Sequence, residues 1–547
     1  MINFLRWWRE DKRYMTMAKA GLLALLPLLC CVVYCASRGR TIGQVYLPNS
    51  MWTDELFYYK QVEGAVGFGY PQGYFGYNES QALKLSFGAW SPVLVCPWLL
   101  WGMFFGWNLM SPIICNIFLM MICCFFYVWM VKPAWKQLGI LALLFCLYTP
   151  FVRYMLSGMP EVICFSVLIC FYSLTVNYLG REKGWKLALM FVMSGTMTLM
   201  RPYLFLFLLL PAYLWVKKDR WKGAIGSIIV MAVTMGLYVC VNHYLVAEYF
   251  YPLFSTDWGT AFSEQGVGGG LLYTLRKLRS TGIDFCLYIV EAFRSGMAAG
   301  AFFAGYVAVL CVFIVEGLRD YLALRQRRRE KRMTGGALAD VDSEDKPRVN
   351  RLIIEIHMVF SFAAMLLALL LIYQLYDGSK HLLTFIATGI FLVPLMNTRH
   401  YKKTVFLGLT FAFFYSYMAV NPYDYQVPFV TVERQESVEK WTGVLEEGMH
   451  LKAEDVPSFD NVVIWVTNDE TESGGKGSQW QLLYSLPEGF GISCCLPEYV
   501  IENFDTLKCG YMATITDGSI DEMCRDAGYR ELYHDSSMVL YAIGQDG

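Results

Sequence analysis

Long apolar runs recur along the first 420 residues of the chain, separated by short polar segments. A helix needs about 20 apolar residues to cross about 30 Å of hydrocarbon. We expect eleven membrane spans, at 17–37, 109–131, 137–153, 161–179, 186–200, 202–216, 223–246, 297–317, 352–376, 380–397 and 403–420. Arg38 and Arg40 directly follow the first run, where a cleaved signal would have small residues, so we expect this span to be retained. The pattern predicts a polytopic α-helical membrane protein.

A further apolar run at 89–107 decides the orientation of everything after it. If this run lies on the outer surface, 27 of the 45 Lys and Arg fall on the cytoplasmic side, as the positive-inside rule requires. Pro92 and Pro97 also disfavour one continuous helix. We therefore expect an interfacial or re-entrant segment, a cytoplasmic N-terminus, and outer segments at 38–108, at 247–296 and after 420.

Two connecting segments have patterns of their own. The loop 318–351 is rich in charge, which predicts a solvated cytoplasmic linker with a basic stripe against anionic lipid. The outer segment 247–296 has a glycine-rich stretch followed by two short amphipathic pieces, each too short to span. Such pieces predict outer-surface helices, which form either a lid hinged at the glycines or a static contact with the membrane surface.

Residues 421–547 differ in kind from the rest, with 23 Asp and Glu against 7 Lys and Arg, a net charge of −16. We predict strands at 461–467, 491–495, 511–515 and 537–543. Residues 519–528 predict a helix with Ser519 as N-cap and Gly528 as C-cap. The chain thus divides into a membrane domain, 1–420, and a small extracytoplasmic α/β domain, 421–547. Of the 17 cysteines, most lie in apolar runs, and those left to pair are Cys494, Cys495, Cys509 and Cys524.

Composition supports the membrane assignment and excludes several functions. Apolar residues make up 56% of the chain and charged residues 17%, against about a quarter in soluble proteins. The sequence has neither a phosphate-binding GxxxxGK[ST] loop nor an HExxH zinc motif. No cytoplasmic segment is long enough to hold a nucleotide or a nucleotide sugar, which argues against ATP-driven transport. We expect the lipid bilayer as a partner and no nucleic acid.

The first outer loop carries the adjacent acids Asp54 and Glu55, close to the first span and among aromatic residues. A carboxylate that is partly desolvated becomes more basic, which suits a general base. An ordinary solvated acidic pair fits the same spacing equally well. The same loop also contains Glu79 and Lys84.

Two further charges lie at membrane level. Glu161 follows Pro160 at the start of the fourth span, near Arg153, and is either a helix-start acid or a second acid of a site. Arg201 interrupts a short hairpin whose first arm, 186–200, reaches only about 22 Å. A cation drawn below the surface needs an anionic partner, which is either a protein carboxylate or a lipid-borne phosphate.

The order of these features resembles the glycosyltransferase C superfamily, in particular the bacterial family 39-like membrane glycosyltransferases, which are similar to protein O-mannosyltransferases and aminoarabinose transferases. The likeness covers about residues 1–420. It lies in the outer-loop Asp54–Glu55 pair, the surface-lying helices, the acid that begins the fourth span, the Arg201–Pro202 step and the soluble tail. The resemblance implies a GT-C-like fold and transfer of a sugar, with inversion. The implied donor is a polyprenyl-phosphate sugar. The implied acceptor is a glycan, lipid or protein on the extracytoplasmic face of the plasma membrane.

The resemblance also implies residue roles. Asp54 matches the carboxylate that takes the acceptor proton, Glu55 is its neighbour, and Glu161 stands in the place of a second acid. Lys84 and Arg201 fall where relatives place phosphate-binding cations, and Arg153 is a further candidate. Some relatives bind a divalent ion; its candidate ligands here are Glu79 and His243, and we assign neither a metal nor another cofactor.

Two other functions remain open at this point. A carrier or flippase for a polyprenyl-linked sugar or a polysaccharide would need no catalytic carboxylate. A hydrolase with paired carboxylates fits less well, because adjacent residues on one loop rarely face each other across a substrate. The location of the candidate charges favours the lipid donor, since nucleotide sugars are absent outside the cell.

Overall fold

The computed structural model describes residues 12–45, 53–68, 75–79, 91–148, 150–245, 257–295, 298–333, 345–373, 375, 379–395, 407–411, 414, 429, 436, 438–441, 443–444, 459–466, 480–486, 490–536 and 538–543. The helices are α2 (Lys12–Ser37), α3 (Thr53–Phe68), α4 (Cys96–Phe105), α5 (Ser111–Val131), α6 (Trp135–Leu147), α7 (Pro150–Met155), α8 (Glu161–Gly180), α9 (Gly184–Met200), α10 (Leu209–Leu245), α11 (Asp257–Ser295), α12 (Ala298–Met333), α14 (Lys346–Leu371), α16 (Leu382–Leu392), α19 (Pro497–Asn503) and α20 (Ser519–Asp526). Short 3-10 helices include η3 (Pro92–Val95), η4 (Pro202–Leu208), η5 (Ser379–His381) and η9 (Trp480–Ser485).

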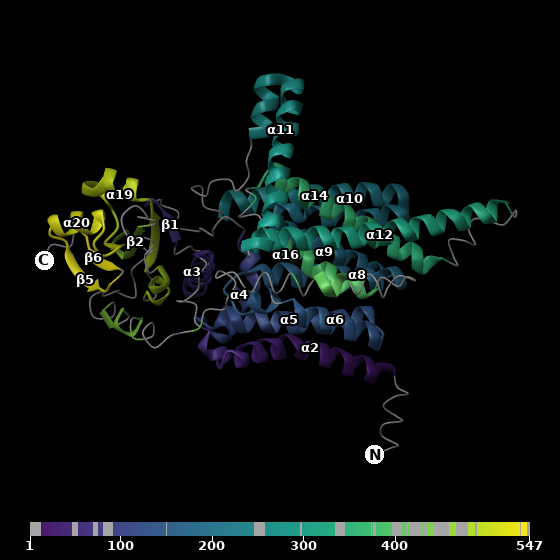
Figure 1. Ribbon diagram of the computed structural model, residues 1–547, viewed down its shortest axis with the longest axis horizontal. Coiled ribbons are helices and arrows are strands. Elements are labelled where there is room, and N and C mark those ends of the chain that lie inside the picture. Colours follow the sequence, from purple (N-terminus) through teal and green to yellow (C-terminus); the bar gives the residue numbers. More distant parts are fainter. Residues whose placement is uncertain are drawn as a thin grey trace, which may run out of the picture.

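The apolar helices lie side by side in a bundle, and a small α/β domain lies at one end of it (Figure 1). We call this end the domain end. Within the described residues, six helices are long and apolar enough to cross a membrane: Tyr14–Ser37, Ser111–Val131, Glu161–Gly180, Pro202–Leu245, Ala299–Met333 and Lys346–Leu371. The chain is therefore a helical membrane protein. The count of eleven crossings stays a prediction, because most of the run 403–420 lies outside the described residues.

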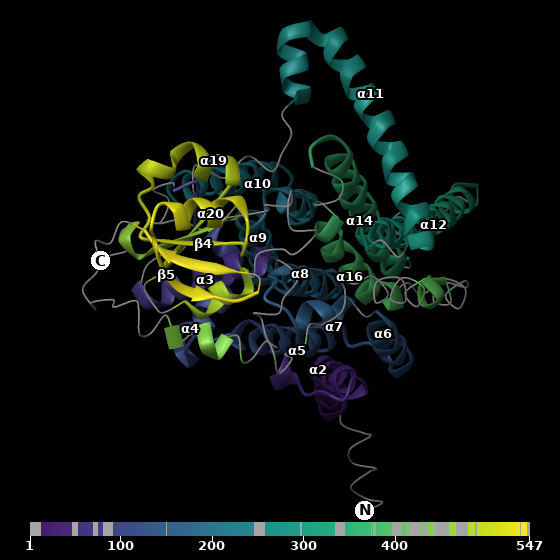
Figure 2. The same ribbon diagram turned by 60° about the vertical axis from the view of Figure 1, so that its left-hand side comes forward.

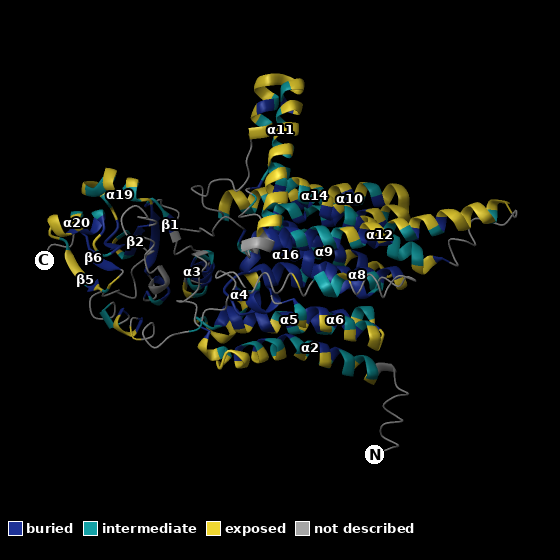
Figure 3. Cartoon of the chain, in the orientation of Figure 1, coloured by how far each residue is buried: buried dark blue, intermediate teal, exposed yellow. Residues whose placement is uncertain are grey.

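Burial identifies the centre of the bundle. The most apolar window of α8 is 78% buried, a larger share than in any other of the six candidate spans. Figure 3 shows the same contrast, with buried residues gathered around α8, α9 and α16 and exposed residues along α2 and α11. An apolar helix that is buried on all sides packs against protein, whereas the outer helices turn apolar side chains toward lipid. The elements next to α8 thus form the core of the membrane domain.

Several predicted spans differ in detail from the structure. The run 137–153 is divided between α6, which ends at Leu147, and α7, which begins at Pro150, because proline is tolerated at the start of a helix but not in its interior. The interfacial run 89–107 contains η3 and α4, and the ten residues of α4 reach about 15 Å, too short to cross. α10 is interrupted at Asp219 and Arg220, whose backbone is non-helical. Gly226, beyond the break, approaches the ring of Trp215, so the two arms run back along each other, in agreement with the separate spans predicted at 202–216 and 223–246.

The segment α11 is longer than predicted. Only Gly266, with a φ of +66°, interrupts it, and the 29 residues that follow form one continuous helix rather than two short pieces. In Figures 1 and 2, α11 extends away from the bundle, and only its last part packs against the other helices. There the Phe285 ring stacks on Phe303 of α12 at 4.5 Å, and the Thr281 hydroxyl donates to the carbonyl of Leu370 in α14 at 2.8 Å. The lid function stays a prediction.

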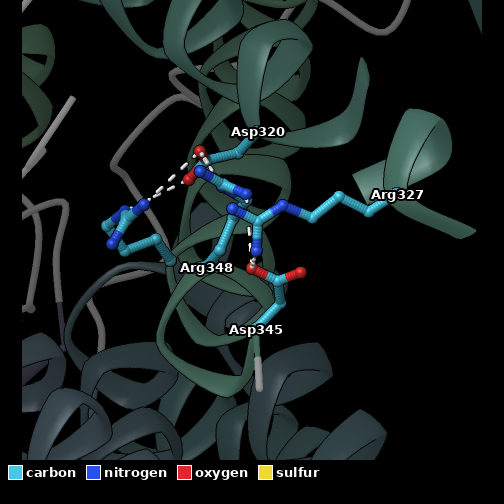
Figure 4. Close-up of polar contacts among 5 residues, drawn as sticks. Asp320, Arg327, Asp345 and Arg348 are labelled. Atoms are coloured by element: carbon cyan, nitrogen blue, oxygen red, sulfur yellow. Dashed lines mark hydrogen bonds and ion pairs between the residues drawn. The ribbon is translucent and has the colours of Figure 1, made fainter. Parts of the chain in front are cut away.

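The prediction of a solvated linker at 318–351 is wrong at both of its ends. α12 continues as a helix to Met333, and α14 begins at Lys346. The side chains between them pair with one another. Buried Asp320 accepts hydrogen bonds from Arg348 at 3.2 Å and from Arg351 at 3.1 Å, and Asp345 accepts one from Arg327 at 2.6 Å (Figure 4). These pairs join the two helices because charged side chains of α12 contact side chains of opposite charge at the start of α14. Residues 334–344 lie outside the described residues.

The sheet of the C-terminal domain has six strands among the described residues, and four of them match the predicted strands. Their order is β1-β3-β2-β4-β6-β5. The strands are β1 (Phe75–Tyr77), β2 (Val462–Val466), β3 (Gly491–Cys495), β4 (Tyr511–Thr514), β5 (Arg530–His534) and β6 (Val539–Ala542). The N-cap of α20 is Gly518, not Ser519, and the helix ends before Gly528, whose φ is +71°. All 17 cysteines are free thiols, including Cys494, Cys495, Cys509 and Cys524.

One strand of this sheet comes from the membrane domain. β1 belongs to the first outer loop, 38–108, and pairs in parallel with β3, so that Tyr77 lies opposite Cys494. A boundary at residue 420 therefore separates the chain in sequence but not in space. The loop that carries α3 is part of the C-terminal sheet.

Candidate active site

The acids Asp54 and Glu55 stand in the first turn of α3, where the helix dipole favours negative charge. Because adjacent residues of a helix point about 100° apart, the two side chains have different surroundings. Asp54 keeps 36% of its side chain exposed, whereas Glu55 is completely buried. The pair predicted as one unit therefore consists of an accessible acid and an inaccessible one.

Asp54 forms an ion pair with Lys380 of η5. Lys380 lies just before α16, more than 300 positions along the chain, and 27% of its side chain is exposed. Both charges thus face each other at a surface that a ligand can reach. We did not predict Lys380, because its run, 380–397, was assigned as a membrane span.

Glu55 accepts a hydrogen bond from the backbone N–H of Gly158 at 3.0 Å through its Oε1 atom. Its Oε2 atom is buried and has no hydrogen-bond partner among the described residues. Burial raises the pKa of Glu55 to about 7, although the positive charge of Arg153 and the Gly158 hydrogen bond lower it. Arg153 of α7 is itself buried, so it acts on Glu55 inside the protein and does not face an open surface.

Glu161 and Arg201 form a second, buried ion pair. The Nη2 atom of Arg201 donates to Oε1 of Glu161 at 2.7 Å, and the side chains are 0% and 1% exposed. Nη1 of Arg201 lies 2.6 Å from Nδ1 of His381 and 3.2 Å from the hydroxyl of Tyr203. Because a guanidinium can only donate, Nδ1 of His381 is the acceptor and carries no proton. Of the two partners considered for Arg201, the structure shows the protein carboxylate.

The two ion pairs belong to one site. Lys380, which pairs with Asp54, directly precedes His381, which contacts Arg201. On the other side, Glu55 accepts from Gly158, three residues before Glu161. Five predicted residues therefore lie in one connected cluster with Lys380 and His381 at the domain end of the bundle: Asp54, Glu55, Arg153, Glu161 and Arg201. We call it the acid–base cluster.

The turn that contacts Glu55, around Gly158, is held by the buried side-chain amide of Asn116. Asn116 of α5 donates through Nδ2 to the carbonyl of Ser157 at 3.0 Å and to that of Met159 at 3.3 Å. Its Oδ1 atom accepts from Nε1 of Trp98 in α4 at 2.9 Å. A fully buried amide with its donors and acceptor engaged fixes the groups around it. Hydrogen bonds and the Ser157–Gly158 peptide unit thus connect Trp98 to Glu55.

Of the remaining candidates, Glu79 and His243 lie elsewhere. Lys84 lies outside the described residues. His243 is exposed on α10 and makes a ring contact with Tyr244. Glu79 is buried against the C-terminal domain, where it accepts hydrogen bonds from the N–H groups of Lys508 and Cys509. In the part of the chain that is described, no group of three or more His, Cys, Asp or Glu has the geometry of a metal site.

The chemistry available at the accessible part of the cluster is that of a base beside a cation. An ionised Asp54 can accept a proton from a hydroxyl group. Lys380 offers three N–H donors and a positive charge to a phosphate. The buried Glu161–Arg201 pair and the Glu55–Gly158 contact hold the surrounding elements together. The fold and site define a helical membrane protein with a charged site at the domain end.

Comparisons with known proteins give only distant similarities. No protein-family model matches the sequence, and no curated protein matches it at a significant level. Among solved structures, ArnT from Cupriavidus metallidurans bound to undecaprenyl phosphate is 10% identical and has a TM-score of 0.42, with 95% of this chain and 97% of that chain covered. The same protein in the apo state gives 10% identity, a TM-score of 0.43 and the same coverage. The function of the site therefore rests on its own geometry.

Proposed function

We propose that the protein is a membrane glycosyltransferase that moves a sugar from a polyprenyl-phosphate donor to an acceptor hydroxyl. The observation that carries this proposal is the ion pair between Asp54 and Lys380, both partly exposed at the domain end of an apolar helical bundle. A carboxylate beside a cation at such a place meets the needs of a hydroxyl acceptor and of a lipid-borne phosphate leaving group. The resemblance of the sequence to the glycosyltransferase C superfamily adds support to it.

In the proposed reaction, Asp54 takes the proton of the acceptor hydroxyl while the oxygen of that hydroxyl attacks the anomeric carbon of the sugar. The bond between that carbon and the phosphate oxygen breaks, and the electron pair leaves with the polyprenyl phosphate. Lys380 stabilises the negative charge that develops on the phosphate. Attack from the side opposite the leaving group inverts the anomeric centre. When the donor binds, its phosphate replaces the Asp54 carboxylate as the partner of Lys380.

The buried charges of the cluster have supporting roles in this proposal. Arg201, which contacts the neighbour of Lys380 in the chain, contributes positive potential to the site. Its hydrogen bonds go to Glu161 and His381. Arg153 acts in the same way behind Glu55. Lys84 stays a candidate for a further phosphate contact. The acceptor class, whether glycan, lipid or protein, and the sugar itself belong to the proposal only as alternatives.

A divalent ion does not fit the residues that were its candidates. Both carboxylate oxygens of Glu79 already accept hydrogen bonds, Oε1 from two backbone N–H groups and Oε2 from the Tyr499 hydroxyl at 3.2 Å. His243 lies exposed on a membrane helix. The proposed reaction therefore uses no metal ion.

The proposal includes an orientation. The positive-inside distribution places the N-terminus in the cytoplasm of a plasma membrane, and it places the acid–base cluster and the C-terminal domain outside. This location agrees with a lipid-linked donor, because nucleotide sugars are made and kept inside the cell. Labelling with a membrane-impermeant reagent tests it, on single cysteines introduced at the exposed position Glu502 and in 325–329 of a variant whose native cysteines are replaced.

The decisive experiment compares Asp54→Asn with Asp526→Asn. The control acid lies exposed at the end of α20 in the C-terminal domain. In a strain that lacks the gene, we expect the lipid-linked sugar donor to accumulate, as measured by mass spectrometry of extracted lipids. Asp526→Asn should clear this donor, whereas Asp54→Asn should reduce transfer by about 10² to 10⁴-fold and leave the donor in place.

A carrier would give the opposite pattern. If Asp54→Asn clears the donor as well as the unmodified protein does, no general base is needed, and the transferase assignment is wrong. Movement of labelled lipid-linked sugar between the leaflets of vesicles, without chemical change, would then identify a flippase. Equal amounts of both variants in the membrane are the control for folding.

A further inference from the structure

The first outer loop completes the sheet of the C-terminal domain. β1 lies at the edge of the sheet, in parallel with β3, and Phe75, Gly76 and Tyr77 face Ile492, Ser493 and Cys494. The N–H of Asn78 continues the pairing by donating to the carbonyl of Cys494 at 2.9 Å, and Oδ1 of Asn78 accepts from the N–H of Leu496 at 3.1 Å. An added edge strand gains its affinity from such main-chain hydrogen bonds.

Glu79 ends this strand with a set of buried contacts. Its Oε1 atom accepts from the N–H groups of Lys508 at 2.6 Å and Cys509 at 2.8 Å, and its own N–H donates to Oγ of Ser493 at 2.8 Å. Its Oε2 atom accepts from the hydroxyl of Tyr499. The side chain is only 4% exposed. A buried carboxylate that takes two backbone N–H bonds is among the stronger polar contacts in a protein, so Glu79 fastens the loop to the domain.

A second set of contacts joins α3 itself to the C-terminal domain. Lys60 is completely buried, and its ammonium group donates to Glu63 at 2.7 Å and to the carbonyl of Leu486 at 3.4 Å. The Tyr59 ring meets the edge of the Tyr484 ring at 5.4 Å, and both rings are buried. These contacts fall between one and two helical turns after Asp54 and Glu55.

A helix transmits displacement along its length because its backbone hydrogen bonds make it stiff. α3 is therefore held at four places: by the cluster at its start, by η9 and by Trp107 near its middle, and by β1 and Glu79 after its end. Nε1 of Trp107, which follows α4, donates to the carbonyl of Tyr59 at 3.1 Å. Two of these four supports belong to the C-terminal domain. The Glu55 contact with Gly158 and the Asp54 contact with Lys380 tolerate little movement, since hydrogen bonds weaken within a few tenths of an ångström.

We propose that the C-terminal domain sets the position of Asp54 and Glu55 through α3, with Glu79 and Lys60 as positioning residues. This inference rests on the proposed function for its meaning in catalysis, but the mechanical coupling stands on the contacts alone. The domain thus acts as the outer support of the site. Its loss removes two of the four supports of α3.

The test compares Glu79→Gln with Asp521→Asn in the full-length protein, by hydrogen exchange of the α3 amides. Asp521 is a matched control because it is also buried and accepts from a backbone N–H, that of Asp517 at 2.7 Å, and from a tyrosine hydroxyl, that of Tyr541 at 2.5 Å. Its contacts lie within the C-terminal domain. We expect exchange in 53–68 to rise about tenfold in Glu79→Gln and to stay unchanged in Asp521→Asn.

Lys60→Met provides a second variant that keeps the length of the side chain and removes the ammonium group that contacts Leu486, Glu63 and the Tyr59 ring. It should raise exchange in α3 in the same way. Unchanged exchange in α3 for both Glu79→Gln and Lys60→Met would overturn the inference. So would an equal rise in Asp521→Asn, because the effect would then follow from general loosening of the domain.

Activity separates this inference from the proposed function. In Glu79→Gln, where exchange in α3 should be faster, we expect slower clearance of the lipid-linked donor. In Asp521→Asn we expect normal clearance. Faster exchange with normal clearance in Glu79→Gln supports the coupling and contradicts the assignment of the reaction to Asp54. Unchanged exchange contradicts the coupling, whatever the clearance.

Discussion

At the scale of single residues, Asp54 and Glu55 show how two neighbours acquire different chemistry. Asp54 is partly hydrated and faces a cation. Glu55 has lost its hydration and has gained one backbone hydrogen bond and the field of Arg153. For Glu55, the cost of burying a charge exceeds both gains, and its pKa rises to about 7. Asp54 alone therefore has the exposure that a base facing a substrate requires.

The raised pKa of Glu55 predicts a pH dependence of stability. The folded protein holds this proton up to about pH 7, whereas an unfolded glutamic acid loses it near 4.5. Stability present below pH 4.5 is therefore lost as the pH rises through 7. Thermal unfolding in detergent should show a falling Tm between pH 5 and pH 8, and Glu55→Gln should flatten this decline. The same decline in Glu55→Gln would show that another group is responsible.

The candidate residues could be predicted where their neighbours in sequence gave the signal. Asp54, Glu55, Glu161 and Arg201 are charges set in apolar or aromatic surroundings, and the structure brings them into one cluster. Lys380 and His381 gave no such signal, because they stand at the start of an apolar run where cations are common. Their role follows from contacts with residues more than 150 positions away. Only the fold supplies that information.

At the scale of elements, the turn between α7 and α8 depends on a residue inside an apolar helix. Asn116 lies within a run that predicts a membrane span and nothing more. Its amide nevertheless satisfies the turn carbonyls of Ser157 and Met159 and receives the indole N–H of Trp98. In a bilayer such groups have no water to replace a lost partner.

Replacement of Asn116 by leucine should therefore destabilise the protein and disturb the cluster. We expect a loss of about 2 kcal/mol, because the Trp98 N–H and the turn carbonyls are left without partners. Met120→Leu, a change of similar shape on the same helix, should cost less than about 1.5 kcal/mol. Thermal unfolding of the purified variants measures both. An equal loss for the two would mean that packing, rather than the amide, holds the turn.

The short strand β1 could not be predicted from the sequence, for a physical reason. β1 has three residues in a loop rich in glycine and tyrosine, and its partner strand begins more than 400 residues later. The four strands that were predicted each have an apolar run of their own. β1 is stabilised almost entirely by its partner, so no local pattern marks it. α12, likewise, continues past its apolar stretch because its charges meet those of α14.

At the scale of the whole molecule, charged contacts at the end of the bundle opposite the C-terminal domain join α12 to α14. Asp320 is buried between Arg348 and Arg351, whose side chains are about one-quarter exposed. Within the bundle, α12 and α14 also share a hydrogen bond from the Tyr306 hydroxyl to the carbonyl of Phe362 at 2.7 Å, and polar contacts of this kind add to packing between helices in lipid. The ion pairs supply a defined register for these two helices.

The variant Asp320→Asn tests this function of the cluster. It leaves two arginines without their shared carboxylate, and we expect a loss of about 2 kcal/mol. Glu330→Gln, which changes an exposed acid farther along α12, should cost less than about 0.5 kcal/mol. Tm values of the purified proteins give the comparison. A small effect of Asp320→Asn in low salt would show that the bundle packs without these pairs.

The edge strand β1 also has a consequence for the making of the protein. Loop 38–108 leaves the ribosome among the first segments of the chain, but its partners, β3 and the N–H groups of Lys508 and Cys509, leave among the last. Contacts of such long range form late, because loop closure must precede them. During synthesis α3 therefore lacks its outer support, and the site is completed only when translation ends. A chain that stops short of β3 should insert its helices into the membrane yet show no activity.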